Sequence, residues 1–165
     1  MAEISDPRQL FEHKLGTALG AEKKVLTMLK MMEQKAQAPE LREGFGRHRE
    51  ETEGQIRNLE QALESFGGAS TSHQDPVTDG IAQHAEQMLG RVDESLADAV
   101  LAGGAAETEH HEIAMYEGLI TMAEAMAAED VVPLLQENLE QEQRTLREIE
   151  SASQRLSQEL AQTAR

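Results

Sequence analysis

A carboxylate set into an apolar helical stripe constrains this chain more than any other feature. Every third or fourth position is apolar over one long segment, apart from one glutamate, in the order Ala102, Ala106, Glu109, Ile113, Tyr116, Ile120, Ala123 and Ala127. This spacing predicts an amphipathic helix whose stripe faces a core. An ionised carboxylate in such a core is costly unless it is paired, hydrogen-bonded or bound to a metal. The stripe therefore predicts a helix whose buried side must supply a partner for Glu109.

Turn and capping residues divide the whole chain into four long helices and one short helix. Asp6-Pro7 and Asp75-Pro76 each place an N-cap aspartate before a proline at the first helical position. The connection before Pro39 is very short and predicts an antiparallel hairpin, whereas the Gly/Ser-rich connection from Gly67 is long enough to cross a bundle. The helices are expected at about 6–36, 39–66, 76–90, 93–127 and 130–162, within one domain over residues 1–165.

Hairpin, crossover with a short helix, and second hairpin together predict an all-α ferritin-like four-helix bundle. Counted from the hairpin turns, every long helix brings an acidic residue into the core within roughly one helical turn of a common plane. The first and fourth helices contribute one glutamate each, and the second and third contribute pairs three residues apart. The expected metal ligands are Glu22, His48, Glu51, Glu109, Glu112 and Glu142.

Five carboxylates and one imidazole suit a pair of iron or manganese ions, because these ligands are mostly hard oxygen donors without sulfur. For any single glutamate, a satisfied core polar group or a surface position is the better explanation, and only the agreement of four helices favours metal. His110 and His111 lie off the stripe and are not expected to be ligands. Tyr116 follows Glu112 by one turn on the inner face and is a core aromatic or a hydrogen-bond donor to a ligand carboxylate.

Composition excludes several other classes of protein. The chain has no cysteine, which rules out disulfides, zinc ribbons and thiol catalysis. The formal charge of −16 argues against binding nucleic acid. No apolar run approaches the roughly 20 residues needed to cross a bilayer, and the first residues lack a signal-peptide pattern. We therefore expect a cytoplasmic protein without membrane or nucleic-acid partners.

Four segments of the sequence resemble the YciF-type ferritin-like stress proteins of bacteria. In numerical order they cover residues 21–23, 48–55, 109–116 and 134–142, with sequences AEK, HREETEGQ, EHHEIAMY and LLQENLEQE. The similarity extends over nearly the whole chain in order and spacing. It implies a ferritin-like bundle, a homodimer and a rubrerythrin-like or ferritin-like metal site. Leu146 departs from the family pattern, which has an acidic residue there, and this weakens the second-metal pocket on the fourth helix.

Three functions remain open on these grounds. The first is a di-iron or di-manganese oxidoreductase that acts on O2 or peroxide in stress protection. The second is iron binding without turnover, and the third is a structural or partner-binding bundle with a vestigial metal site. No segment resembles a rubredoxin tail, so the chain offers no built-in electron donor. Apolar residues left outside the main stripes, among them Val25, Ile81 and Leu89, predict a dimer patch that includes the crossover.

Overall fold

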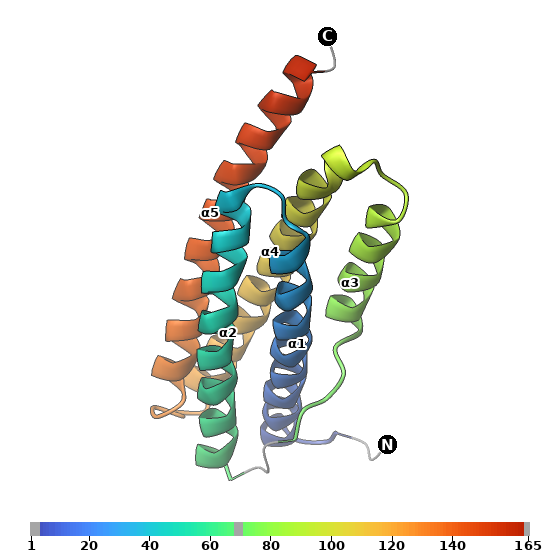
Figure 1. Ribbon diagram of the computed structural model, residues 1–165. Coiled ribbons are helices and arrows are strands. Elements are labelled where there is room, and N and C mark those ends of the chain that lie inside the picture. Colours follow the sequence, from blue (N-terminus) through green and yellow to red (C-terminus); the bar gives the residue numbers. More distant parts are fainter. Residues whose placement is uncertain (1–3, 68–70, 164–165) are drawn as a thin grey trace.

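The computed structural model describes residues 4–67 and 71–163 and shows an all-helical chain without β-strands in those ranges. The α-helices are α1 (Pro7–Lys35), α2 (Pro39–Ser65), α3 (Pro76–Leu89), α4 (Ala97–Ala125) and α5 (Val132–Thr163), and a 3-10 turn, η1, covers Glu94–Leu96. The four long helices lie side by side, with α3 on the outside next to α1 and α4 (Figure 1). Two hairpins, α1–α2 and α4–α5, are joined by the crossover, so the predicted ferritin-like four-helix bundle is confirmed.

Aspartate caps fix the beginnings of α1 and α3 as the sequence predicts. The Asp6 carboxylate accepts a hydrogen bond from the Gln9 backbone N–H at 2.9 Å, and Asp75 accepts from the backbone of Thr78 at 3.1 Å. The helix expected from residue 93 begins later, because Asp93 caps the 3-10 turn and α4 follows that turn. None of the helices in the described ranges is both long and apolar enough to span a membrane.

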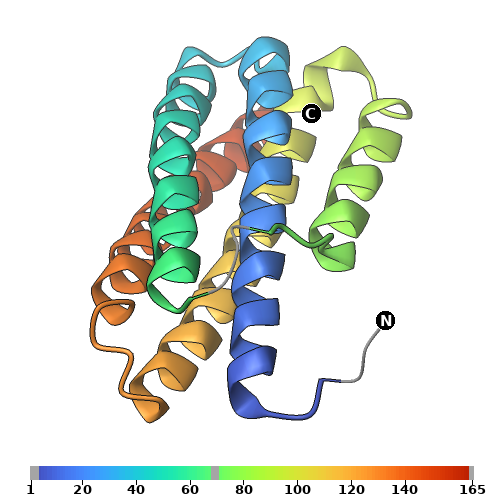
Figure 2. The same cartoon turned by 90° about the horizontal axis from the view of Figure 1, so that it is seen from below.

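The crossover docks on α1 at two glycines. The backbone N–H of His73 donates to the carbonyl of Gly16 at 2.8 Å. A Cβ atom at Gly20 would lie 1.7 Å from the carbonyl oxygen of His73, so only glycine allows this close approach. Figure 2 shows the segment before α3 passing alongside α1. This contact places α3 against the α1–α4 side of the bundle.

Two apolar clusters fill the bundle, and all four long helices contribute to both. The first cluster includes Phe11, Leu15, Leu19, Leu59, Leu63, Tyr116, Leu119 and Leu135. The second includes Val25, Leu29, Leu41, Phe45, Leu101 and Ile149. On each long helix, the buried polar residues fall between the members of the two clusters. The core is therefore a polar layer held between two apolar ones, which is the arrangement that the interrupted stripes predict.

The structure removes one residue, Val25, from the expected dimer patch. The expectation that Val25 belongs to an exposed patch is wrong, because its side chain is 2% exposed and packs inside the second apolar cluster. Ile81 and Leu89 on α3 are half-buried, and Leu89 packs against the same cluster. Of the three residues expected in the patch, only Ile81 and Leu89 on α3 remain candidates.

Candidate metal centre

Four buried side chains from three helices meet in the polar layer. They are His48 of α2, Glu109 and Glu112 of α4, and Glu142 of α5, and each is at most 2% exposed. One nitrogen or oxygen atom from each of the four lies within 4.8 Å of the others. Helix geometry explains the pair on α4, because residues three apart point to the same side of a helix. The group is of a size and composition that could hold a metal ion.

His48 lies between two of these carboxylates. Its Nε2 atom is 3.0 Å from Oε1 of Glu109 and 3.7 Å from Oε2 of Glu142. Burial acts to lower the pKa of His48, but the Glu109 carboxylate, with Glu51 and Glu142, outweighs it and raises the pKa well above its usual value. Without metal, this shift favours the protonated imidazole, which would neutralise part of the acidic charge.

Glu112 is the least satisfied member of the group. Its side chain is fully buried, and neither carboxylate oxygen has a hydrogen-bond partner among the described residues. Burial raises the pKa of Glu112 well above its usual value, and the carboxylates of Glu22 and Glu142 raise it further. One buried oxygen on each of Glu22, Glu109 and Glu142 is likewise without a partner in the described chain. Carboxylate oxygens aimed at one another without donors are what a cation between them would satisfy, so the residues fit a metal.

Glu22 extends the cluster toward α1. The hydroxyl of Tyr116 donates to Oε1 of Glu22 and accepts from the side-chain amide of Asn138 at 3.0 Å. Burial raises the pKa of Glu22 to about 7, although the hydrogen bond from Tyr116 acts in the opposite direction. The hydrogen bond that the sequence suggested for Tyr116 is therefore present, and it links α4 to α1 and α5.

Three partners of the cluster lie outside the predicted ligand set. The Gln55 side-chain amide donates to Oε1 of Glu142, Asn138 donates to Tyr116, and the Thr145 hydroxyl lies 3.4 Å from Nδ1 of His48. Asn138 and Thr145 continue an alternating spacing of three and four residues along α5, which runs Leu135, Asn138, Glu142, Thr145, Ile149 and Ala152. This spacing could have identified Asn138 and Thr145 as core positions. Both residues are polar, so a search for apolar residues at helical spacing does not include them.

Glu51 lies at the edge of the cluster rather than in it. Its Oε1 atom is 2.6 Å from the guanidinium of Arg144, its Oε2 atom is 3.9 Å from Nδ1 of His48, and its side chain is 30% exposed. His48 and Arg144 lower the pKa of Glu51 below its usual value. The structure thus brings together five of the six expected residues in the buried layer and directs Glu51 toward α5.

His111 has a partner outside the cluster. Its Nε2 atom lies 2.7 Å from Oδ2 of Asp75, the aspartate that caps α3. Burial acts to raise the pKa of Asp75, but hydrogen bonds from Thr78 and His111 lower it below its usual value. This contact ties α3 to α4 next to Glu112.

The fold and the cluster define a ferritin-like helical bundle with a buried carboxylate–histidine group that could hold a metal ion. Residues 6–162 match the sequence model of a family described as a domain of unknown function, DUF892. The chain belongs to this family. The resemblance to YciF-type proteins is confirmed by Protein YciF of Escherichia coli (strain K12), which is 31% identical over 138 residues and 82% of this chain, and 83% of its own length.

Solved structures show the same fold. The crystal structure of the E. coli stress protein YciF matches with a TM-score of 0.88 and 27% identity, over 94% of this chain and 99% of that one. YcfI from Rhodopseudomonas palustris, described as a proposed structural protein, matches with a TM-score of 0.87 and 30% identity, over 90% and 95% of the two chains. A protein from Xanthomonas campestris pv. campestris, at 21% identity and a TM-score of 0.77 over 96% and 99%, supports the fold alone.

Proposed function

We propose that this chain is a carboxylate-bridged di-metal protein with a role in bacterial stress, and that it acts on O2 or peroxide or binds iron. One observation carries the proposal: the two oxygens of Glu112 are fully buried, unpartnered in the described chain, and directed into a group of acidic residues. A site without metal must protonate such a carboxylate, whereas a divalent cation would satisfy it directly.

The first ion would be held by His48, Glu109, Glu112 and Glu142, and Glu22 with Glu112 would supply oxygens to the second. This donor set contains hard oxygens and one nitrogen, which favours iron or manganese over copper. Glu51 joins the set only when its carboxylate leaves Arg144. When bound, such metals supply the one-electron chemistry that protein side chains lack.

The chain's own residues would then orient the ligands and control protons. Tyr116 holds Oε1 of Glu22 and leaves Oε2 of that residue available. Gln55 does the same for Glu142, because its amide occupies Oε1 and leaves Oε2 unpartnered within the described chain. Such outer hydrogen bonds fix the rotamers of ligands and are typical of built metal sites. The apolar clusters lie on both sides of the layer and close it to bulk water at its two ends.

Metal content after purification without chelator tests the proposal, with Glu109→Ala as the variant. Glu109 is 1% exposed beside His48, so its loss is expected to abolish stoichiometric iron or manganese binding and to leave the helical fold intact by circular dichroism. The controls Glu107→Ala and Glu117→Ala remove exposed carboxylates of the same helix and are expected to keep full metal content. Full occupancy in the Glu109 variant, or its loss in a control, would contradict the assignment.

A structural bundle without metal is the second candidate, and His48 is the observation that favours it. Its imidazole lies between Glu109 and Glu142 and already offsets negative charge there. The R. palustris relative is also described as a proposed structural protein. In this case the wild-type protein would remain metal-free after incubation with ferrous or manganous salts, and would melt at the same temperature with and without them.

A homodimer is also proposed, on the resemblance and on the half-buried apolar residues of α3. Ile81 and Leu89 lie on this outer helix and are the expected centre of the contact. Light scattering at micromolar concentration and moderate salt is expected to give twice the chain mass of 18.2 kDa. Ile81→Glu should shift the mass to that of one chain, whereas Gln83→Glu, at an exposed position of the same helix, should leave it unchanged.

A further inference from the structure

A cavity of about 570 Å³ opens between α2 and α5 and reaches the polar layer at His48 and Thr145. Its size falls in the range of small-molecule sites. Apolar side chains form its floor, namely Leu41, Phe45, Ile149 and Ala152, and His48 and Thr145 form its inner end. Gly44 contributes no side chain, and a Cβ atom built there would meet only the Arg47 guanidinium at 3.9 Å. We call this cavity the α2–α5 groove.

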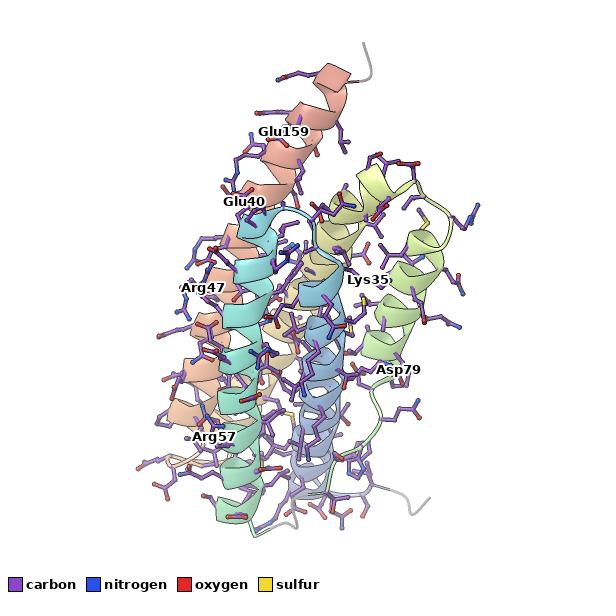
Figure 3. The ribbon with its side chains drawn as sticks, viewed as in Figure 1. Lys35, Glu40, Arg47, Arg57, Asp79 and Glu159 are labelled. Atoms are coloured by element: carbon purple, nitrogen blue, oxygen red, sulfur yellow. The ribbon has the colours of Figure 1, made fainter. Side chains whose placement is uncertain are left out.

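Arginines gather around the groove although the chain as a whole is strongly acidic. Four of the 15 basic residues line it, namely Arg47, Arg144, Arg147 and Arg155, against three glutamates, while the chain carries a net charge of −16. Figure 3 labels two of the lining residues, Glu40 and Arg47, along α2. The groove is thus a local exception to the acidic surface and would attract an anion rather than a cation.

The arginines are available to a ligand to different degrees. Arg47, Arg144 and Arg155 form ion pairs that cross from one helix to the other, with N···O distances of 3.0, 2.6 and 3.0 Å. The pairs of Arg47 and Arg155 are exposed and contribute little, whereas the half-buried carboxylate of Glu51 holds Arg144. Arg147 has no ion-pair partner among the residues that the structure describes.

We propose that the α2–α5 groove binds a small amphipathic organic anion, whose carboxylate pairs with Arg147 and Arg144 and whose apolar part lies on Leu41, Phe45 and Ile149. The apolar floor argues against a purely inorganic anion, and the charge of the rim argues against an amine or a neutral lipid. A second copy of this chain would also offer acidic groups to the arginines, because the chain is strongly acidic. The groove, however, has the volume of a small ligand rather than the area of a protein–protein contact. The lining shares His48 with the proposed metal ligands, so the experiment below follows metal content separately from anion binding.

The probe is decanoate, titrated by calorimetry into the purified full chain below its micelle concentration, with decyltrimethylammonium as the matched cation. Saturable binding of one decanoate per chain and none of the cation is expected. Arg147→Gln should weaken decanoate binding by about tenfold or more, because a charge-assisted hydrogen bond is lost. Arg57→Gln, which removes an exposed arginine of α2 outside the groove, should change it by less than about twofold.

Gly44→Leu provides a second variant that fills the groove. Leucine favours the helix over glycine, so this variant is expected to fold at least as well as the wild type while losing decanoate binding. Its metal content should match that of the wild type, which keeps this test separate from the metal proposal. Absence of decanoate binding in the wild type, equal binding of both probes, or full binding in Gly44→Leu would overturn the proposal. A change of chain mass in Gly44→Leu would overturn it in favour of a second copy in the groove.

Discussion

The hydroxyl of Tyr116 joins α4 to α1 and α5 through a donated bond to Glu22 and an accepted bond from Asn138. Tyr116→Phe removes both and leaves two buried polar groups without that partner, which is expected to cost about 1–3 kcal/mol of unfolding free energy in urea denaturation. The loss should be smaller in metal-loaded protein, because the metal would hold Glu22 in place. An equal loss with and without metal would contradict a role of Glu22 as ligand.

Glu51 shows a limit of what the sequence alone can predict about the site. The spacing of three from His48 correctly places both residues on one side of α2, but it cannot show that Arg144, 93 residues further along, takes the carboxylate. Glu22, Glu109 and Glu142 were identifiable because each interrupts an apolar stripe, and such an interruption is visible in one helix alone. A partner that comes from another helix leaves no local pattern.

The end of α4 contains an alanine where helices usually place glycine. Ala127 has a φ of 52°, and the N–H groups of Ala127 and Ala128 donate to the carbonyls of Glu124 and Ala123, which is the Schellman arrangement. Ala127→Gly is expected to stabilise the protein by about 1 kcal/mol in thermal or urea unfolding, because the left-handed conformation strains a residue with a Cβ. Ala125→Gly, at the last residue of the same helix, should have the opposite sign.

The α1–α2 turn depends on a residue of the other hairpin. The N-cap position of α2 is Ala38, which has no capping side chain, and the carboxylate of Asp98 in α4 accepts instead from the N–H groups of Gln37 and Ala38, both at 2.8 Å. Asp98→Ala is expected to cost about 1–2 kcal/mol in urea unfolding. The exposed control Asp130→Ala should change stability by less than about 0.5 kcal/mol. The sequence predicted the turn but gave no sign of this long-range cap.

At the scale of the whole molecule, the buried charges set the response of metal-free protein to pH. Glu22, Glu112, Glu142 and His48 all have folded pKa values raised above their usual ones. Each binds more protons when folded, so stability rises as pH falls from above 7 toward about 4.5. Below that range, carboxylates with lowered pKa values such as Glu51 reverse the trend. Thermal melting of chelator-treated protein measures this, and a flat or falling melting temperature between pH 7 and 5 would contradict it.

The whole bundle was predictable because its determinants repeat along the chain. Stripes at helical spacing, Asp-Pro helix starts and one long connection are enough to specify two hairpins and a crossover. The path of the crossover was not predictable. It depends on contacts of Gly16 and Gly20 with the backbone of His73, which lies more than 50 residues later in the chain. The same limit applies to the groove between α2 and α5, whose arginines are unremarkable on each helix and meet only in the folded protein.

The two hairpins each contribute part of the polar layer, and this affects how fragments of the protein would behave. The first hairpin carries Glu22 and His48, and the second carries Glu109, Glu112 and Glu142. A single proteolytic cut in the crossover would leave two fragments, each with an incomplete set of donors. Such fragments would reassociate through their apolar clusters. With the proposed metal site, added iron or manganese would tighten the pair and a chelator would loosen it, so the cut protein would report metal binding.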